Sequence, residues 1–142
     1  MQVSENFDVR EFVGPAVWGK WKDKSIWFID RRVIDISQTL RIKLGKPITI
    51  NNWHIGGRFH ESGLRTPGDE TYKQWSQHSF GRAADLKVEG MTPEDVMIHI
   101  IGLTKMYRDM GLGAIEDIAL TPSWLHFDCR YNPTTAIQIV RP

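Results

Sequence analysis

The sequence of 142 residues predicts an α+β fold, with helices packed on one face of a small, mainly antiparallel sheet. Two observations lead to this prediction. Apolar residues recur at helical spacing over residues 30–44, and a strong helix start follows at Thr92. Short β-rich segments lie between and after these two stretches. A chain of this length can bury one sizeable core, so we expect residues 1–142 to form a single domain.

The first half of the chain predicts a short turn, one helix and one strand. Residues 6–12 predict a helical turn, whereas residues 14–25 mix Gly, Pro, Trp and Lys and predict irregular structure. The helix over 30–44 should end at the glycine and proline that follow it. Its apolar face comprises Val33, Ile34, Ile36, Leu40 and Leu44. Residues 47–51 are β-rich and predict a strand, and a loop should follow until residue 77.

The second half of the chain predicts the rest of the sheet and a second helix. Residues 83–88 predict a strand. Thr92 should cap a helix that has proline at its first position and runs to about Asp109. Residues 112–118 and 124–130 predict a strand pair, and 137–140 a last edge strand.

Composition excludes several classes of function. Lys and Arg number 18 against 17 Asp and Glu, so we expect no nucleic-acid partner. No apolar run approaches the ~20 residues of a membrane span, so we expect no membrane insertion. Residues 1–6 do not resemble a signal peptide, and the one cysteine, Cys129, allows no intrachain disulfide. We therefore expect synthesis in the cytoplasm, while the sequence is silent on oligomeric state.

The strongest chemical signal is a set of two histidines and an aspartate: His78, Asp85 and His126. This is a ligand set of hydrolytic zinc sites, which keep a fourth coordination position open. Small residues separate His78 from Asp85 and let the backbone pass close to an ion. Strand alternation places Trp124, His126 and Asp128 on one face of their strand.

Hydrolysis also needs a carboxylate that moves protons. Glu116 and Asp117 end the strand that we pair with the His126 strand, so either could reach the metal. Of these two candidate bases we place Glu116 ahead of Asp117. Asp128 is a third candidate, but we favour a role in which it holds a histidine ring or Arg130.

The segment Ser76-Gln77-His78-x-x-Gly81-x-Ala83-x-Asp85 resembles the S-x-H-x-x-G-x-A-x-D signature of the zinc D-Ala-D-Ala peptidase family. Residues 124–130 are similar to the hydrophobic-His-x-Asp-x-Arg ending of its carboxypeptidase branch, and the resemblance covers roughly residues 30–130. It implies a core shared with the hedgehog signalling domain. It also implies one zinc ion per chain, held by His78, Asp85 and His126.

The resemblance also suggests roles for neighbouring residues. Arg65 matches a family arginine that would bind a substrate carboxylate or stabilise an oxyanion, although a donor that fixes the loop is an equal alternative. Ser76 and Gln77 should orient the loop of His78. One position departs from the family: Ser123 stands where several members carry a catalytic glutamate.

Two functions follow as hypotheses. The first is a zinc peptidase that cleaves stem peptides of bacterial peptidoglycan, as a D,D-carboxypeptidase or endopeptidase. It would be a phage-encoded lysis or virion-associated enzyme acting on the host cell wall. The alternative is a non-catalytic zinc-binding phage module, which Ser123 favours. The six tryptophans suggest core and lid packing or, alternatively, a groove that stacks on sugars or peptide.

Overall fold

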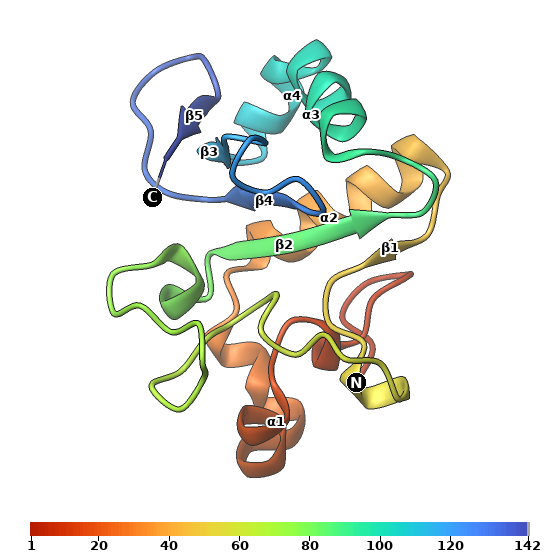
Figure 1. Ribbon diagram of the computed structural model, residues 1–142, viewed down its shortest axis with the longest axis vertical. Helices are drawn as coiled ribbons and strands as arrows, with labels where there is room; N and C mark the ends of the chain where they lie inside the picture. The colour runs from red at the N-terminus through yellow and green to blue at the C-terminus, as the bar shows by residue number, and fades with distance from the viewer. Residues whose placement is uncertain (142) are drawn as a thin grey trace.

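The computed structural model describes residues 1–141 and contains a five-stranded sheet in the order β1-β2-β4-β3-β5 (Figure 1). The strands are β1 (Ile48–Thr49), β2 (Ala83–Val88), β3 (Ala114–Glu116), β4 (Leu125–Asp128) and β5 (Gln138–Val140). Neighbouring strands pair antiparallel except β3 and β5, which pair parallel at one edge. The predicted α+β class with a mainly antiparallel sheet is confirmed.

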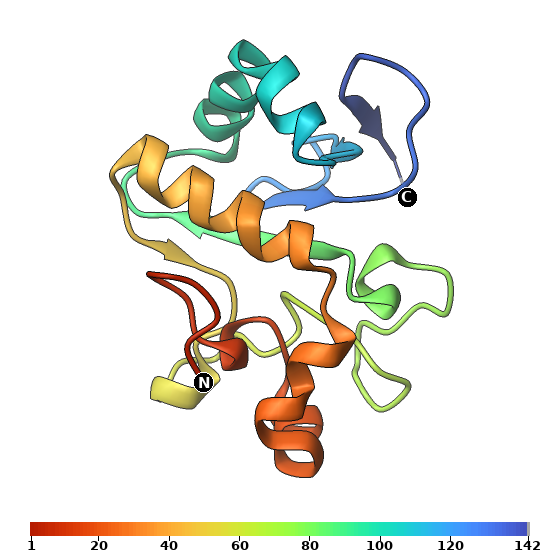
Figure 2. The ribbon, with the colours of Figure 1, turned by 180° about the vertical axis from the view of Figure 1, so that it is seen from behind.

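Three helices cover one face of this sheet: α2 (Arg31–Leu44), α3 (Pro93–Gly102) and α4 (Thr104–Asp109). Figure 2 shows α2 lying across β2 on this face. Alternation along β2 and β4 turns their apolar side chains toward the helices, where one core cluster forms with residues of all three. The strand residues in this cluster include Ala84, Leu86, Leu125 and Phe127. The opposite face of the same strands is left for polar side chains.

The prediction of irregular structure over residues 14–25 is wrong. Helix α1 (Pro15–Trp21) and a 3₁₀ segment, η2 (Lys22–Phe28), occupy this stretch. Pro15 takes the first helical position, where its missing N–H costs nothing, and Gly14 precedes it as the cap. Val17 packs against Val13 and a leucine of a distant loop, so tertiary contacts favour a helix that the mixed composition conceals.

The helix that starts at Thr92 is capped as expected but is shorter than predicted. The Thr92 hydroxyl accepts a hydrogen bond from Asp95 N at 3.1 Å, and the Asp95 carboxylate accepts one from Thr92 N at 2.9 Å. The helix ends at Gly102, and α4 begins anew at Thr104. The Thr104 hydroxyl donates to the carbonyl of Ile101, an alternative to continuous helical bonding.

The predicted strands hold in type: the strand over residues 83–88 is found with the same bounds, and the others are shorter than the sequence suggested. The segment 112–118 forms β3 over three residues, and 124–130 forms β4 over four. The predicted strand at 47–51 is reduced to two residues. Among the described residues no helix combines the length and the apolar character that crossing a membrane requires.

Candidate metal centre

Three strands place polar side chains in one row on the face away from the core. Asp85 of β2 lies directly opposite His126 of β4. Extending the pairing of β3 with β4 by one residue sets Glu116 opposite His126 on the other side. The carboxylate of Asp85, the imidazole of His126 and the carboxylate of Glu116 therefore lie side by side on three neighbouring strands. Side chains directly opposite each other on paired strands lie close together.

His78 reaches this row from a 3₁₀ turn, η4 (Gln77–Phe80), that precedes β2. The Ser76 hydroxyl caps the turn by accepting a hydrogen bond from His78 N at 3.3 Å. Gly81 ends the turn with φ of 65°, and a side chain there would collide with the carbonyl of Phe28. The serine and the glycine of the signature thus both contact or end the turn that carries His78.

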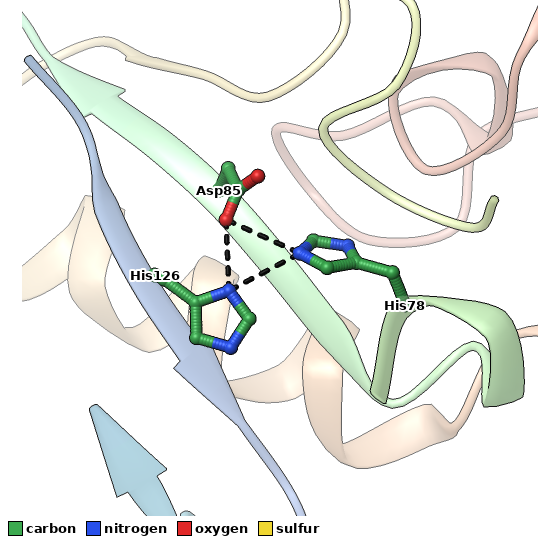
Figure 3. A group of neighbouring side chains, drawn as sticks. All are labelled: His78, Asp85 and His126. Carbon is green, nitrogen blue, oxygen red and sulfur yellow. Dashed lines mark hydrogen bonds and ion pairs between the residues drawn. The ribbon is translucent and has the colours of Figure 1, made fainter. Parts of the chain in front are cut away.

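One atom of each predicted ligand points to a common centre (Figure 3). The Asp85 Oδ1 atom lies 2.8 Å from His126 Nδ1 and 3.2 Å from His78 Nε2, and the two nitrogens are 3.1 Å apart. Ligand atoms bound tetrahedrally at ~2.0–2.1 Å from a metal ion would be about 3.3 Å apart. The His78–Asp85–His126 group could therefore hold a metal ion with little rearrangement.

The hydrogen bonds on the outer side of each ring are compatible with the tautomer that a metal requires. His78 Nδ1 donates to the carbonyl oxygen of Gly63 at 2.8 Å, which leaves Nε2 unprotonated. His126 contacts a carboxylate on each side, with Nε2 3.2 Å from Asp128 and Nδ1 2.8 Å from Asp85, so a neutral ring that donates to Asp128 has Nδ1 free for a metal ion. Two lone pairs and a carboxylate oxygen then face one another, an arrangement that only a cation or a shared proton can satisfy.

The charges of the three side chains show how they interact when no metal ion is bound. Burial would raise the pKa of Asp85, but the neighbouring imidazoles of His78 and His126 outweigh it and hold the pKa well below its usual range. Burial would likewise lower the pKa of His126, yet hydrogen bonds to Asp128 and Asp85 raise it to about 9. Without a metal, the cluster retains a proton in the place where a metal ion would bind.

Asp128 supports the cluster from behind. Its side chain is fully buried, and Arg130 binds both of its oxygens, at 2.8 Å from Nε and 2.6 Å from Nη2. The same carboxylate accepts the His126 hydrogen bond. Asp128 therefore holds both a histidine ring and Arg130, the role favoured from the sequence.

The guanidinium group of Arg65 is hydrogen-bonded to groups of the protein. Its Nη2 donates to Asp85 Oδ2 at 2.6 Å, and its Nε donates to the carbonyl of Glu61 at 2.7 Å. These contacts leave Asp85 Oδ1 as the free ligand atom. These hydrogen bonds correspond to the alternative in which Arg65 fixes the local structure. The one to Asp85 also orients the carboxylate of that predicted ligand.

The two candidate bases are separated by the alternation of the strand. Glu116 lines the cleft around the histidines, and its Oε2 lies 4.0 Å from His126 Nδ1. Asp117 points away and pairs with Arg141 at 2.8 Å. The structure brings Glu116 to the site and does not bring Asp117. Ser123 is exposed on the preceding turn and does not line the cleft.

The ligands open into a cleft of about 720 Å³. Trp124 and Gln77 line it, as does Tyr72 from the preceding loop. The Gln77 Oε1 atom is buried and has no hydrogen-bond partner among the described residues. Gln77 shapes the turn through its backbone, because its carbonyl accepts a hydrogen bond from Arg82 N at 2.9 Å.

Sequence reasoning missed two contributions to the site. The carbonyl of Gly63 fixes His78, and Gly63 is itself required there because a side chain would collide with the backbone of Phe12. Tyr72 lines the cleft from a loop without any motif. Every residue has a backbone carbonyl, so the sequence gives no sign that this one binds His78. The only local signal in the sequence is the glycine at position 63.

Comparison with known proteins adds one distant similarity. No family model matches the sequence, and no solved structure matches the fold. A protein of Halalkalibacterium halodurans named "putative adenine deaminase" is 24% identical over 123 residues. The match covers 87% of this chain and 20% of that protein, so the chain spans about a fifth of its relative's length.

Proposed function

We propose that the protein is a zinc-dependent peptidase that hydrolyses peptide bonds of bacterial peptidoglycan stem peptides, as a D,D-carboxypeptidase or endopeptidase. The observation that carries the proposal is the convergence of three ligand atoms, 2.8–3.2 Å apart, beside the carboxylate of Glu116. The substrate class rests on the resemblance of residues 76–85 and 124–130 to the D-Ala-D-Ala peptidases.

The ligand set favours zinc over other biological cations. Two imidazole nitrogens and one carboxylate oxygen suit a tetrahedral zinc ion, whereas calcium and magnesium prefer oxygen ligands in larger numbers. The outer hydrogen bonds to Gly63 and Asp128 are the support that histidine ligands of zinc usually have. When bound, zinc would polarise the scissile carbonyl and make water a stronger nucleophile at neutral pH.

Side chains of the protein would transfer the protons and keep the metal ligands aligned. Glu116 would accept a proton from the attacking water and return it to the leaving nitrogen, since it is the acidic side chain that faces the ligands without binding Arg65 or Arg130. Arg65 would keep Asp85 aligned. Glu116 thereby takes over the task that the glutamate missing at Ser123 performs in other members of the resembled family.

Metal content and turnover test the proposal together. The purified protein should contain about one zinc ion per chain and should release D-alanine or stem peptides from muropeptides. His126→Ala should lose both zinc and activity, and a variant that kept both would refute the site. Zinc without turnover on any muropeptide would instead favour the alternative, a non-catalytic zinc-binding module. A phage-encoded enzyme would act on the wall of its host.

Adenine is a useful second substrate in the same assay, because the relative from Halalkalibacterium halodurans is named as a deaminase. Hydrolytic deamination also uses a metal-activated water, which attacks an amidine carbon in place of a carbonyl. Ammonia release from adenine, with no cleavage of muropeptides, would overturn the peptidase and replace it with this reaction.

A further inference from the structure

A second cleft of about 500 Å³ adjoins the first. It lies between the α1–η2 segment, the loop that precedes η4, and η4 itself. Arg65 and Tyr72 line both clefts, so the two clefts share part of their walls. Figure 1 shows α1 at the end of the molecule remote from α3 and α4, beyond the loops that precede β2. The metal centre does not account for this second cleft.

Aromatic rings dominate the lining of the second cleft and remain open to solvent. Trp27 is 68% exposed, Phe80 46% and Trp21 38%. Trp21 stands edge-on to Phe28, with ring centroids 5.1 Å apart, which fixes its orientation. Large rings gathered in a hollow and left exposed are typical of a binding surface.

The boundary between the clefts is also aromatic. Trp75 lines the metal cleft and Phe80 lines the second one, and their ring centroids are 6.5 Å apart. Trp75 is itself 77% exposed. Each cleft therefore contributes one ring to this aromatic pair.

Cationic side chains border these rings. The Lys24 ammonium lies 5.5 Å from the ring centroid of Trp27, and the Lys20 ammonium lies 5.3 Å from that of Trp21. The cleft thus offers flat apolar faces next to hydrogen-bond donors. A pyranose ring matches this chemistry, because it has an apolar C–H face and a rim of hydroxyl groups. An apolar peptide side chain would be better served by a closed pocket without charges.

We propose that the second cleft binds a sugar ring of the glycan strand to which the stem peptide is attached, with Trp27 as the principal stacking surface. This inference rests on the proposed function for the choice of substrate. It assigns a task to the aromatic segment 18–28, and it makes a glycan-linked stem peptide a better substrate than the free peptide.

Two measurements test the sugar site, one of them independent of catalysis. The first is binding of chitotriose, followed by tryptophan fluorescence and calorimetry. The second is kcat/KM on a stem peptide with and without its disaccharide, using the zinc-loaded protein. The variants are Trp27→Ala and Trp27→Phe, with Tyr131→Ala as the control. Tyr131 is 88% exposed and lines neither cleft.

We expect the wild type to bind chitotriose and to cleave the disaccharide-linked peptide with about tenfold higher kcat/KM, equivalent to ~1.4 kcal/mol. Trp27→Ala should abolish chitotriose binding and the higher kcat/KM on the disaccharide-linked peptide, without changing kcat/KM on the free peptide. Trp27→Phe should retain part of both effects. Tyr131→Ala should match the wild type. Because Trp27 is largely exposed, its truncation should leave the fold intact.

The outcomes separate the two proposals. Equal kcat/KM on both peptides, together with no chitotriose binding, would overturn the sugar site and leave the peptidase standing. Loss of activity on the free peptide in Trp27→Ala would also overturn it, because the cleft would then bind peptide. Chitotriose binding that depends on Trp27, with no peptide cleavage by any variant, would support the sugar site and contradict the peptidase.

Discussion

Replacing Asp128 by asparagine tests how the hydrogen bonds behind the metal centre control its occupancy. The change preserves the shape of a fully buried side chain and removes its charge. In the wild-type protein, both oxygens of Asp128 accept hydrogen bonds from Arg130. The Oδ2 atom also accepts the hydrogen bond from His126 Nε2, at 3.2 Å. An amide has only one acceptor oxygen, so its NH₂ group must face a donor of one of these partners.

If the amide donates to His126 Nε2, the ring must carry its proton on Nδ1. That proton would then point at Asp85 Oδ1, only 2.8 Å away, and would fill the place of the metal. Loss of support behind a metal ligand typically weakens metal binding by about 10–100-fold, which corresponds to ~1.4–2.7 kcal/mol. Removing the charge from a buried hydrogen-bonded pair should also destabilise the metal-free protein by about 1–3 kcal/mol.

Zinc affinity, measured by competition with a chromophoric chelator, and thermal unfolding with and without zinc provide the assay. Asp117→Asn is the matched control, because Asp117 also pairs with an arginine, at 2.8 Å, but lies away from the ligands. We expect only Asp128→Asn to lower zinc affinity. Unchanged affinity in a folded Asp128→Asn protein, or an equal loss in both variants, would refute the reasoning.

Three further predictions concern catalysis, packing and pH. Glu116→Gln should retain zinc and lose about 10²–10⁴-fold in kcat on muropeptides, whereas full activity would move the base elsewhere. Gly81→Ala should destabilise the protein by more than ~2 kcal/mol in thermal unfolding, because its side chain would collide with Phe28. Burial raises the pKa of Glu11 from 4.5 to about 7, so the folded state holds a proton that the unfolded state releases. The stability from this proton is complete below pH ~4.5 and lost as pH rises to ~7. Glu11→Gln should therefore stabilise the protein at pH 8 by about 1 kcal/mol, a value reduced for partial solvent screening, with no gain at pH 4.

Much of the fold could be predicted because its signals are local. The helix over 30–44 follows from apolar spacing, and the start at Thr92 follows from a capping pattern that the structure reproduces. The segment 14–25 was wrongly predicted as irregular, because the helix there depends on packing of Val17 against Val13 and a distant loop. The helix after Thr92 divides at Leu103, where side-chain bonding competes with the helix.

The ligand set of the site could also be predicted, since residue type and spacing carry it. His78 and Asp85 are brought together by one turn and the strand that follows. The sequence left Glu116 and Asp117 as alternative bases, because both end the same strand. Alternation puts neighbouring residues on opposite faces, and only the pairing of β3 with β4 decides which face meets His126.

The sequence by itself therefore predicted the class of fold, the His78–Asp85–His126 group and the favoured position of Asp128 against a histidine ring or Arg130. Each depends on contacts within a short stretch of chain or on the chemistry of a residue type. Only the tertiary structure decided the hydrogen bond that orients His78, the placement of Glu116 rather than Asp117 beside the histidines, and the position of Arg65 and Tyr72 in the walls of both clefts. These depend on strand register and on backbone carbonyls from remote segments, which no local pattern encodes.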